Sequence, residues 1–147
     1  MTIPTSGPMT GRIASLTEQP LDVAAHEAAV AHRHGGAVVS FCGVVREHDH
    51  GRLVTRLEYH AHPSAADGLA RIAQEFAEIP GVLAVAVSHR VGSLDVGDVA
   101  LIAAVSTAHR REAFEVCGRL VDEVKHRLPV WKRQVFDDGT DEWVNCP

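Results

Sequence analysis

Apolar residues recur along this chain with two different spacings, which separate predicted strands from predicted helices. Short apolar runs rich in β-branched residues predict buried strands over residues 37–45, 82–87 and 99–105. The run over 99–105 is apolar at every position, so we expect a central strand that is covered on both faces. Shorter or weaker patterns predict further strands over residues 13–16, 54–60, 130–136 and 143–144.

Apolar positions spaced three and four residues apart predict three amphipathic helices. One helix covers residues 21–33, with Asp22 as N-cap, and ends before Gly35 and Gly36. A second helix covers residues 64–77, where Ser64 and Asp67 fit a capping pattern. The longest helix covers residues 110–127 and is stopped by Pro129. Its predicted apolar face consists of Ala113, Phe114, Cys117, Leu120, Val121, Val124 and Leu128.

The resulting order of elements is β-α-β-β-α-β-β-α-β-β, with polar turns over residues 46–52 and 91–98. Such an order predicts an α+β domain with a largely antiparallel sheet. The length of 147 residues fits one domain, which we place at residues 13–147. Residues 1–12 carry two prolines and two glycines and predict a flexible N-terminal segment.

Composition narrows the possible classes of protein. The 14 basic and 19 acidic residues give a net charge of −5, which argues against a surface that coats nucleic acid. The three cysteines are odd in number and lack CxxC spacing, which favours reduced thiols in a cytosolic protein. No apolar run reaches the roughly 18 residues of a membrane span, and no signal peptide is evident at the N-terminus. We therefore expect a soluble cytoplasmic protein.

The distribution of cations is unusual. Twelve of the 14 basic residues are arginine, and the two lysines are Lys125 and Lys132. A lysine amine can lose its proton when desolvated and then act as a base or nucleophile, whereas arginine stays charged. Lys125 falls at the rim of the apolar helix face, and Pro129 turns the chain so that both amines can reach one cleft. Compositional bias and lysines that merely cover apolar surface are the alternatives, and spacing alone does not separate them.

The segment STAHRR, residues 106–111, joins a buried strand to the start of the long helix. Free backbone N–H groups and the helix dipole suit this junction to an anion, and His109, Arg110 and Arg111 strengthen that reading. Simple capping by Ser106 or Thr107, with both arginines solvated, is the alternative.

Other reactive side chains carry weaker signals. The pairs His48-x-His50 and His60-x-His62 could offer metal ligands, but no Cys₂His₂ or HExxH pattern accompanies them, and we expect no metal. Cys42 and Cys117 lie in apolar segments and are interpreted as small core residues.

Five segments together resemble a known family: FCGVVRE (41–47), HRVGSLDVGD (89–98), VSTAHRREAF (105–114), VKHRLPVWKRQ (124–134) and DGTDEWV (138–144). From about residue 21 to residue 144, the chain is similar to the catalytic (large) subunit of molybdopterin synthase. The resemblance implies an α/β hammerhead fold with three helices and a role in molybdenum cofactor biosynthesis.

The resemblance also implies a reaction and its partners. Enzymes of this family convert cyclic pyranopterin monophosphate into molybdopterin by adding two sulfurs as a dithiolene, without a cofactor of their own. The sulfur comes from a small ubiquitin-like subunit whose C-terminal Gly-Gly ends as a thiocarboxylate. Two large subunits form a central homodimer within a heterotetramer.

The family's site residues transfer to named positions here. Lys125 and Lys132 match the two active-site lysines, and His109, Arg110 and Arg46 match residues that hold the substrate anion. The remaining implied pocket residues are Phe41, Val44, Val45, Arg133 and Gln134. Two departures concern contacts with other subunits: EYHAHPSA replaces a tyrosine-rich stretch, and residues 145–147 stand where many members continue into a basic tail. A non-catalytic paralogue that binds the ubiquitin-like partner and a histidine-rich metal-binding protein are the competing hypotheses.

Overall fold

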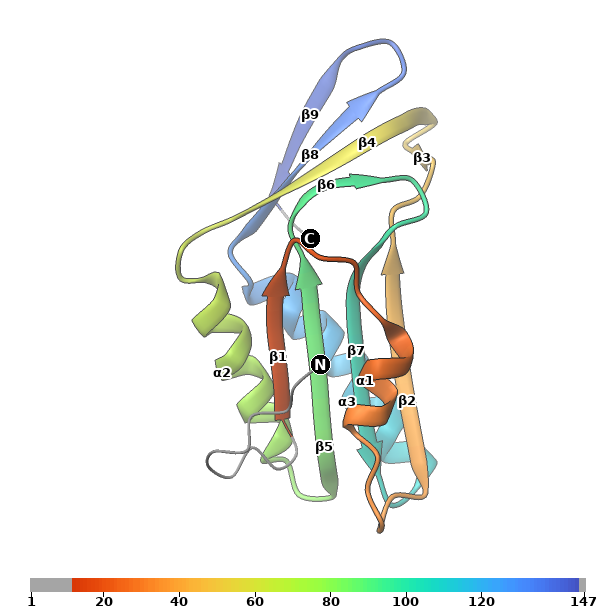
Figure 1. The fold of residues 1–147 in the computed structure, drawn as a ribbon, viewed down its shortest axis with the longest axis vertical. Helices are drawn as coiled ribbons and strands as arrows, with labels where there is room; N and C mark the ends of the chain where they lie inside the picture. The colour runs from red at the N-terminus through yellow and green to blue at the C-terminus, as the bar shows by residue number, and fades with distance from the viewer. Residues whose placement is uncertain (1–11, 146–147) are drawn as a thin grey trace.

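The computed structural model describes residues 12–145, which form nine strands and three helices (Figure 1). The elements are β1 (Arg12–Thr17), α1 (Val23–Ala29), β2 (Ala37–Val44), β3 (His48–Asp49), β4 (Arg52–Ala61), α2 (Ala65–Ala77), β5 (Val82–Arg90), β6 (Gly92–Asp95), β7 (Val99–Thr107), α3 (Arg110–Arg127), β8 (Val130–Phe136) and β9 (Asp141–Asn145). The predicted flexible segment, residues 1–12, lies outside the described residues except for Arg12, whose backbone begins β1.

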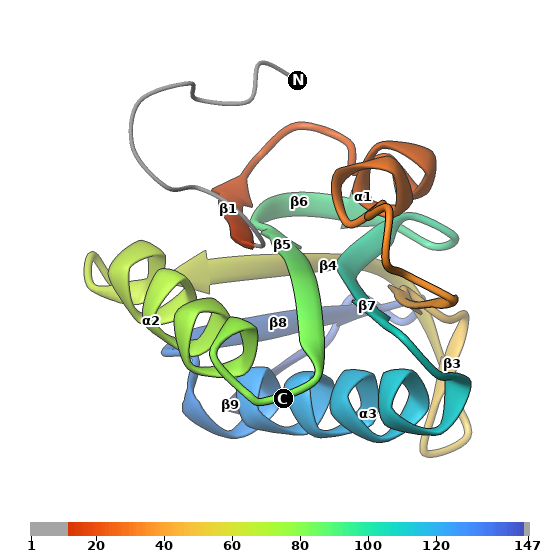
Figure 2. The same ribbon diagram turned by 90° about the horizontal axis from the view of Figure 1, so that it is seen from below.

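The first sheet has the strand order β1-β5-β7-β2, in which β1 is parallel to β5 and the other pairs are antiparallel. Helices α2 and α3 cover one face of this sheet, and α1 covers the other (Figure 2). Every residue of β7 after Val99 is buried, which confirms the prediction of a central strand covered on both sides.

The second sheet stands at one end of the first and forms the hammerhead (Figure 1). Its strands follow the order β3-β4-β8-β9, and β6 also pairs with β4. All of these pairs are antiparallel, so the predicted α+β class with a largely antiparallel sheet is confirmed. None of the helices formed by residues 12–145 is both long and apolar enough to cross a membrane.

Two strands were missed because they lie in segments rich in turn residues. β6 falls within residues 91–98, where Leu94 is fully buried opposite Leu57 of β4, so one apolar side chain holds the strand in the sheet. β3 falls within residues 46–52 and pairs with β4 across a tight turn. In that turn, His50 and Gly51 both have positive φ values, 52° and 78°, as a two-residue hairpin of this type requires.

The helix ends and faces also differ in detail from the predictions. α1 ends at Ala29 instead of continuing to residue 33, and a turn closed by the Gly35 N–H and the His32 carbonyl follows it. The Ser64 hydroxyl does not cap α2, because it bonds to Nδ1 of His62 at 2.8 Å. Phe114 was assigned to the apolar face of α3, but it is 65% exposed.

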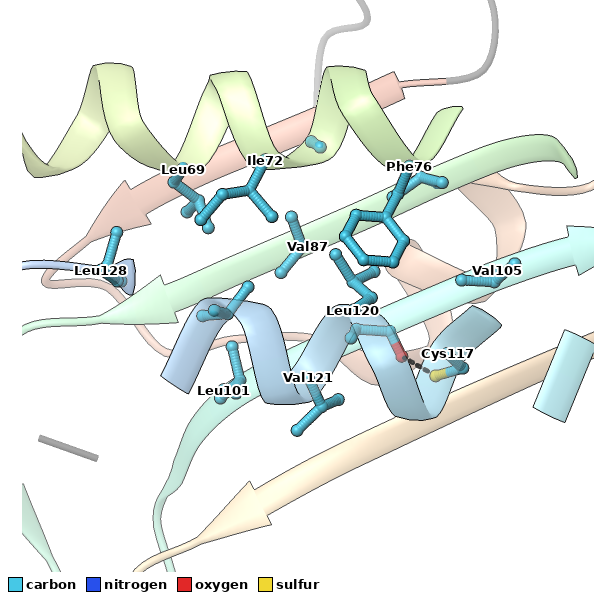
Figure 3. Close-up of a cluster of buried hydrophobic side chains, with 14 of the residues drawn as sticks. Leu69, Ile72, Phe76, Val87, Leu101, Val105, Cys117, Leu120, Val121 and Leu128 are labelled. Carbon is cyan, nitrogen blue, oxygen red and sulfur yellow. Dashed lines mark hydrogen bonds between the residues drawn. The ribbon is translucent and has the colours of Figure 1, made fainter. Parts of the chain in front are cut away.

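The main core lies between helices α2 and α3 and the first sheet (Figure 3). Leu69, Ile72 and Phe76 reach it from α2, and Leu120 reaches it from α3. Cys117 is also buried there, with its Sγ 3.7 Å from the Ala103 carbonyl oxygen. Burial raises the pKa of Cys117 to about 11, which keeps the thiol protonated and confirms its interpretation as a core residue.

Removing a large side chain from this core should cost much more stability than removing one from the exposed side of the same helix. Leu120 is fully buried and Glu115 is exposed, and both belong to α3. We expect Leu120→Ala to lower the free energy of unfolding by about 2–5 kcal/mol. Glu115→Ala should change it by less than about 0.5 kcal/mol. Denaturant unfolding of both variants measures the difference, and equal losses would contradict the assigned packing of α3.

Candidate active site

A cavity of about 250 Å³ lies where the hammerhead meets the end of the first sheet and the last turn of α3. We call it the hammerhead cavity. The residues that line it are Gly43, Val44, Val45, Arg46, His48, Asp49, Val54, Leu57, Tyr59, His89, Ala100, Leu101, Val124, Lys125, Leu128, Val130, Lys132 and Gln134. Its walls therefore combine apolar strand residues with a small set of polar and charged groups, as is common in ligand sites.

Both lysines of the chain line this cavity, as their spacing around a proline predicted. α3 ends at Arg127, and Pro129 has no N–H group with which to continue it. The chain turns there, and the Pro129 carbonyl accepts a hydrogen bond from the His62 N–H at 3.0 Å, which ties the turn to the hammerhead. Lys132 is half-buried, whereas Lys125 is exposed and lines the cavity from the last turn of α3.

The end of β2 and the segment that follows it supply further lining residues. Val44 is half-exposed and Val45 is buried, and both line the cavity together with Arg46. The Arg46 side chain is 81% exposed, and its Nη2 lies 3.5 Å from Oδ1 of Asp49. Asp49 is the single carboxylate among the lining residues, so the cavity has an excess of positive charge.

The floor of the cavity holds two buried polar side chains. Gln134 is 2% exposed and His89 is 6% exposed, and neither the Gln134 amide nor Nε2 of His89 bonds to another residue of the described chain. Burial lowers the pKa of His89, against the opposing hydrogen bond to Arg90, and the charge of Lys125 lowers it further. His89 was not among the predicted site residues, although its position at the end of a buried apolar strand was a usable signal.

Two implied pocket residues lie elsewhere. Phe41 packs against the main core and does not line the hammerhead cavity. Arg133 lies on the outer face of β8, where its Nε donates to Asp141 at 2.6 Å and its Nη1 donates to Glu58 at 3.1 Å. Alternation along the strand explains this placement, because Lys132 and Gln134 on either side of Arg133 both face inward.

His109 and Arg110 line a different hollow, at the N-terminus of α3, together with Gly36, Ala108 and Arg111. No side chain caps this helix end, so the alternative of capping by Ser106 or Thr107 was wrong. Gly36 is required beside it, because a Cβ there would lie 2.2 Å from the Ala108 carbonyl oxygen. Lys125 lies near the other end of the 18-residue helix α3, so roughly 22 Å along the helix axis separate it from Arg110.

Histidine side chains do not form a metal centre within residues 12–145, where no group of three or more His, Cys, Asp or Glu side chains is placed to hold an ion. His48 and His50 lie near the carboxylates of Glu47 and Asp49, at 3.9 and 3.7 Å. His60 stacks against Trp143 on the outer face of the hammerhead.

The lowered pKa of His89 predicts a specific dependence of stability on pH. Because the unfolded histidine titrates near 6.5 and the folded one below it, the unfolded state binds more protons in mild acid. The stabilising contribution is complete above about pH 7 and is lost as the pH falls through the folded pKa. We expect the free energy of unfolding to fall less steeply between about pH 7 and pH 5 in His89→Gln than in the wild type. Equal slopes in denaturant titrations would contradict the assigned shift.

Comparisons with known proteins identify the family and agree with this fold. The family model described as MoaE protein matches residues 16–127. The molybdopterin synthase catalytic subunit of Halalkalibacterium halodurans is 38% identical over 92% of this chain and 87% of its own length. That of Pyrococcus abyssi is 41% identical over 88% and 89%. The crystal structure of molybdopterin synthase from Staphylococcus aureus superposes with a TM-score of 0.81 at 32% identity, covering 88% of this chain and 94% of that one. The chain therefore belongs to the MoaE protein family, the family of molybdopterin synthase catalytic subunits.

Proposed function

We propose that this chain is the sulfur-transferring catalytic subunit of a molybdopterin synthase and that Lys125 and Lys132 act in the hammerhead cavity. Its substrate is cyclic pyranopterin monophosphate, and its sulfur donor is the thiocarboxylated C-terminus of a small ubiquitin-like subunit. The observation that carries the proposal is that the chain's two lysines, from α3 and β8, line one cavity. The presence of both amines also favours a catalytic subunit over a non-catalytic paralogue.

The charges of the cavity suit anionic ligands. Arg46, Lys125 and Lys132 supply three cations against the single carboxylate of Asp49, within a chain whose net charge is −5. A phosphate on the substrate and a thiocarboxylate on the partner are both attracted to such a site. Asp49 pairs with Arg46, so an anion that binds to Arg46 competes with the Asp49 carboxylate.

The division of chemical labour follows from these groups. The thiocarboxylate sulfur is the nucleophile that attacks the pterin side chain, so the protein needs no cysteine for the transfer. Cys117 is unsuited to the role, because its thiol is buried and its pKa is raised. The transferred sulfur still carries the partner's acyl group, and water then adds to that carbonyl carbon and displaces the sulfur, which leaves the partner's C-terminus as a carboxylate. The lysines stabilise the negative charge that develops on the carbonyl oxygen and exchange protons with the water and the departing sulfur.

His109 and Arg110 cannot reach the same phosphate as Lys125 within one chain, because they lie at opposite ends of α3. We infer that they act on a substrate held mainly by the second copy, in a homodimer that carries one small subunit on each chain as a heterotetramer. The uncapped N–H groups of α3 and the exposed Arg110 support anion binding at this end. We also infer a cytoplasmic location, because Cys42 and Cys117 are free thiols.

Replacing the lysines tests the central assignment. In a reconstitution with thiocarboxylated partner and pterin substrate, Lys125→Ala should lower dithiolene formation by about a hundredfold or more, and Lys132→Ala should lower it strongly. Lys125→Arg should be nearly as damaging, because arginine keeps the charge but does not readily release a proton. Circular dichroism and partner binding serve as controls. Activity close to wild type in a folded Lys125→Ala protein that binds its partner would overturn the assignment.

Mixed dimers test whether two copies share a site. Arg110→Ala should weaken substrate binding by about tenfold to a hundredfold, because it removes a charge-assisted hydrogen bond. A dimer of one Arg110→Ala chain and one Lys125→Ala chain, isolated with two different tags, contains one intact shared site. It should regain about half of the wild-type activity, since the two sites are related by symmetry. A mixed dimer no more active than either parent, or an unchanged KM in Arg110→Ala, would contradict the shared site.

A further inference from the structure

His89 occupies an unusual place for a titratable side chain. It lies near the end of β5, where the first sheet meets the hammerhead, and it is 6% exposed while lining the cavity. Val87 and Val85, two and four residues earlier on the same face of the strand, belong to the main core under α2 and α3. His89 therefore lies on the core-facing side of β5, in line with these two valines. Its ring lines the hammerhead cavity at the end of the strand.

Two contacts fix the orientation and tautomer of this ring. Its Nδ1 lies 2.7 Å from the Arg90 carbonyl oxygen, and a carbonyl can only accept, so Nδ1 carries the proton. The ring also meets Tyr59 edge-on, with centroids 4.8 Å apart and planes at 82°. The remaining nitrogen, Nε2, is then an unprotonated acceptor, and it bonds to no other residue within the described part of the chain.

Three of the four charged side chains that line the cavity with His89 are cations. They are Lys125 of α3, Lys132 of β8 and Arg46, which follows β2, and the fourth is Asp49 of β3. The Asp49 carboxylate lies within 4 Å of both Arg46 and His50, so its charge is shared between two neighbours. Nε2 of His89 is thus an acceptor at the cavity surface that is not committed to another described residue, in a cavity that contains two ammonium groups.

We propose that His89 is a positioning residue, whose Nε2 accepts a hydrogen bond from the ammonium group of Lys125 and holds it over the reacting carbonyl. The catalytic consequence rests on the proposed function, whereas the contact itself does not. Of the two lysines that line the cavity with His89, Lys125 is the one whose charge lowers the pKa of His89. No hydrogen bond or ion pair holds its exposed side chain within residues 12–145.

A neutral acceptor suits this task better than a carboxylate. Burial and the charge of Lys125 lower the pKa of His89, so the ring stays uncharged at neutral pH and adds no negative charge to a site that must attract anions. A carboxylate in its place would compete with the phosphate and the thiocarboxylate for the same lysine. The buried ring also loses little side-chain entropy on binding, whereas the free Lys125 side chain must be ordered.

Two amide substitutions separate the proposed contact from a structural role. Glutamine reaches the position of Nε2 with an acceptor oxygen but gives up the bond to Arg90. Asparagine reaches the position of Nδ1 with a donor and keeps that bond but leaves no acceptor. We expect His89→Gln to keep dithiolene formation within about threefold of wild type and His89→Asn to lower it by about tenfold or more, as for a lost hydrogen bond to a charged group.

A second readout does not require turnover. Acetic anhydride labels neutral amines, and peptide mass spectrometry gives the labelling rate of Lys125 relative to Lys132 within the same molecule. Loss of the acceptor destabilises the Lys125 ammonium, so His89→Asn should raise this ratio by about threefold, and His89→Gln should leave it near the wild-type value.

The outcomes are distinct. An unchanged labelling ratio in His89→Asn overturns the proposal, as does an active His89→Asn beside an inactive His89→Gln, which would assign the role to the Arg90 contact. If the wild-type chain makes no dithiolene with a competent partner, the proposed function fails, but the labelling ratio still decides whether His89 holds Lys125.

Discussion

The packing of α3 against the first sheet is the constraint on which the candidate site depends. Leu120 and Val124 are buried in the main core against residues that include Leu101, Ala103 and Val105 of the covered strand β7, so the helix can neither slide nor rotate without exposing apolar surface. Its two ends are thereby fixed at opposite ends of the sheet. One end is pressed against the backbone at Gly36, and the other delivers Lys125 to the hammerhead. Pro129, two residues after the end of α3, cannot continue the helix, so the chain turns there toward the hammerhead.

The hammerhead adds the second lysine through strand alternation. β8 is paired on both sides, with Tyr59 of β4 opposite Lys132 and Val144 of β9 on the other side of it. On the outer face, Arg133 joins Glu58 and Asp141, and hydrogen bonds from His60, Arg56 and Arg133 lower the pKa of Glu58 despite some desolvation. Arg133 therefore contributes to the site by holding the strands that orient Lys132, although it does not face the cavity itself.

The predicted bounds of helices and strands were most accurate for elements with one buried face. The bounds of α3 and β8 agree with those predicted, because a long apolar stripe and a following proline leave few alternatives. β6 was missed because it is held by pairing with β4, which is distant in the sequence, and β3 was missed because its two residues are too few to show a strand pattern. The predicted burial of Phe114 was wrong for a related reason. Spacing identifies the apolar side of a helix, but the extent of the sheet beneath the helix decides which residues on that side are covered. For the site, the spacing around Pro129 predicted that both lysines reach one cavity, and the predicted helix over residues 110–127 already implies that Arg110 lies far from Lys125. The sequence analysis did not predict that His89 lines the same cavity.

The cavity combines mobile charges with fixed neutral polar groups, and this contrast has a physical reason. Lys125 and Arg46 are exposed on long side chains, so they can follow an anionic substrate and a partner tail as these enter and leave. His89 and Gln134 are buried in the sheets, so their side chains have little freedom to move with a ligand. Glutamine carries no charge, and the lowered pKa of His89 keeps its ring neutral at neutral pH. A buried charge in their place would need a permanent partner and would cost stability throughout the catalytic cycle. Neutral polar groups in the cavity instead offer the exposed cations hydrogen-bond partners in fixed positions. The packing of α3 against the first sheet holds those positions.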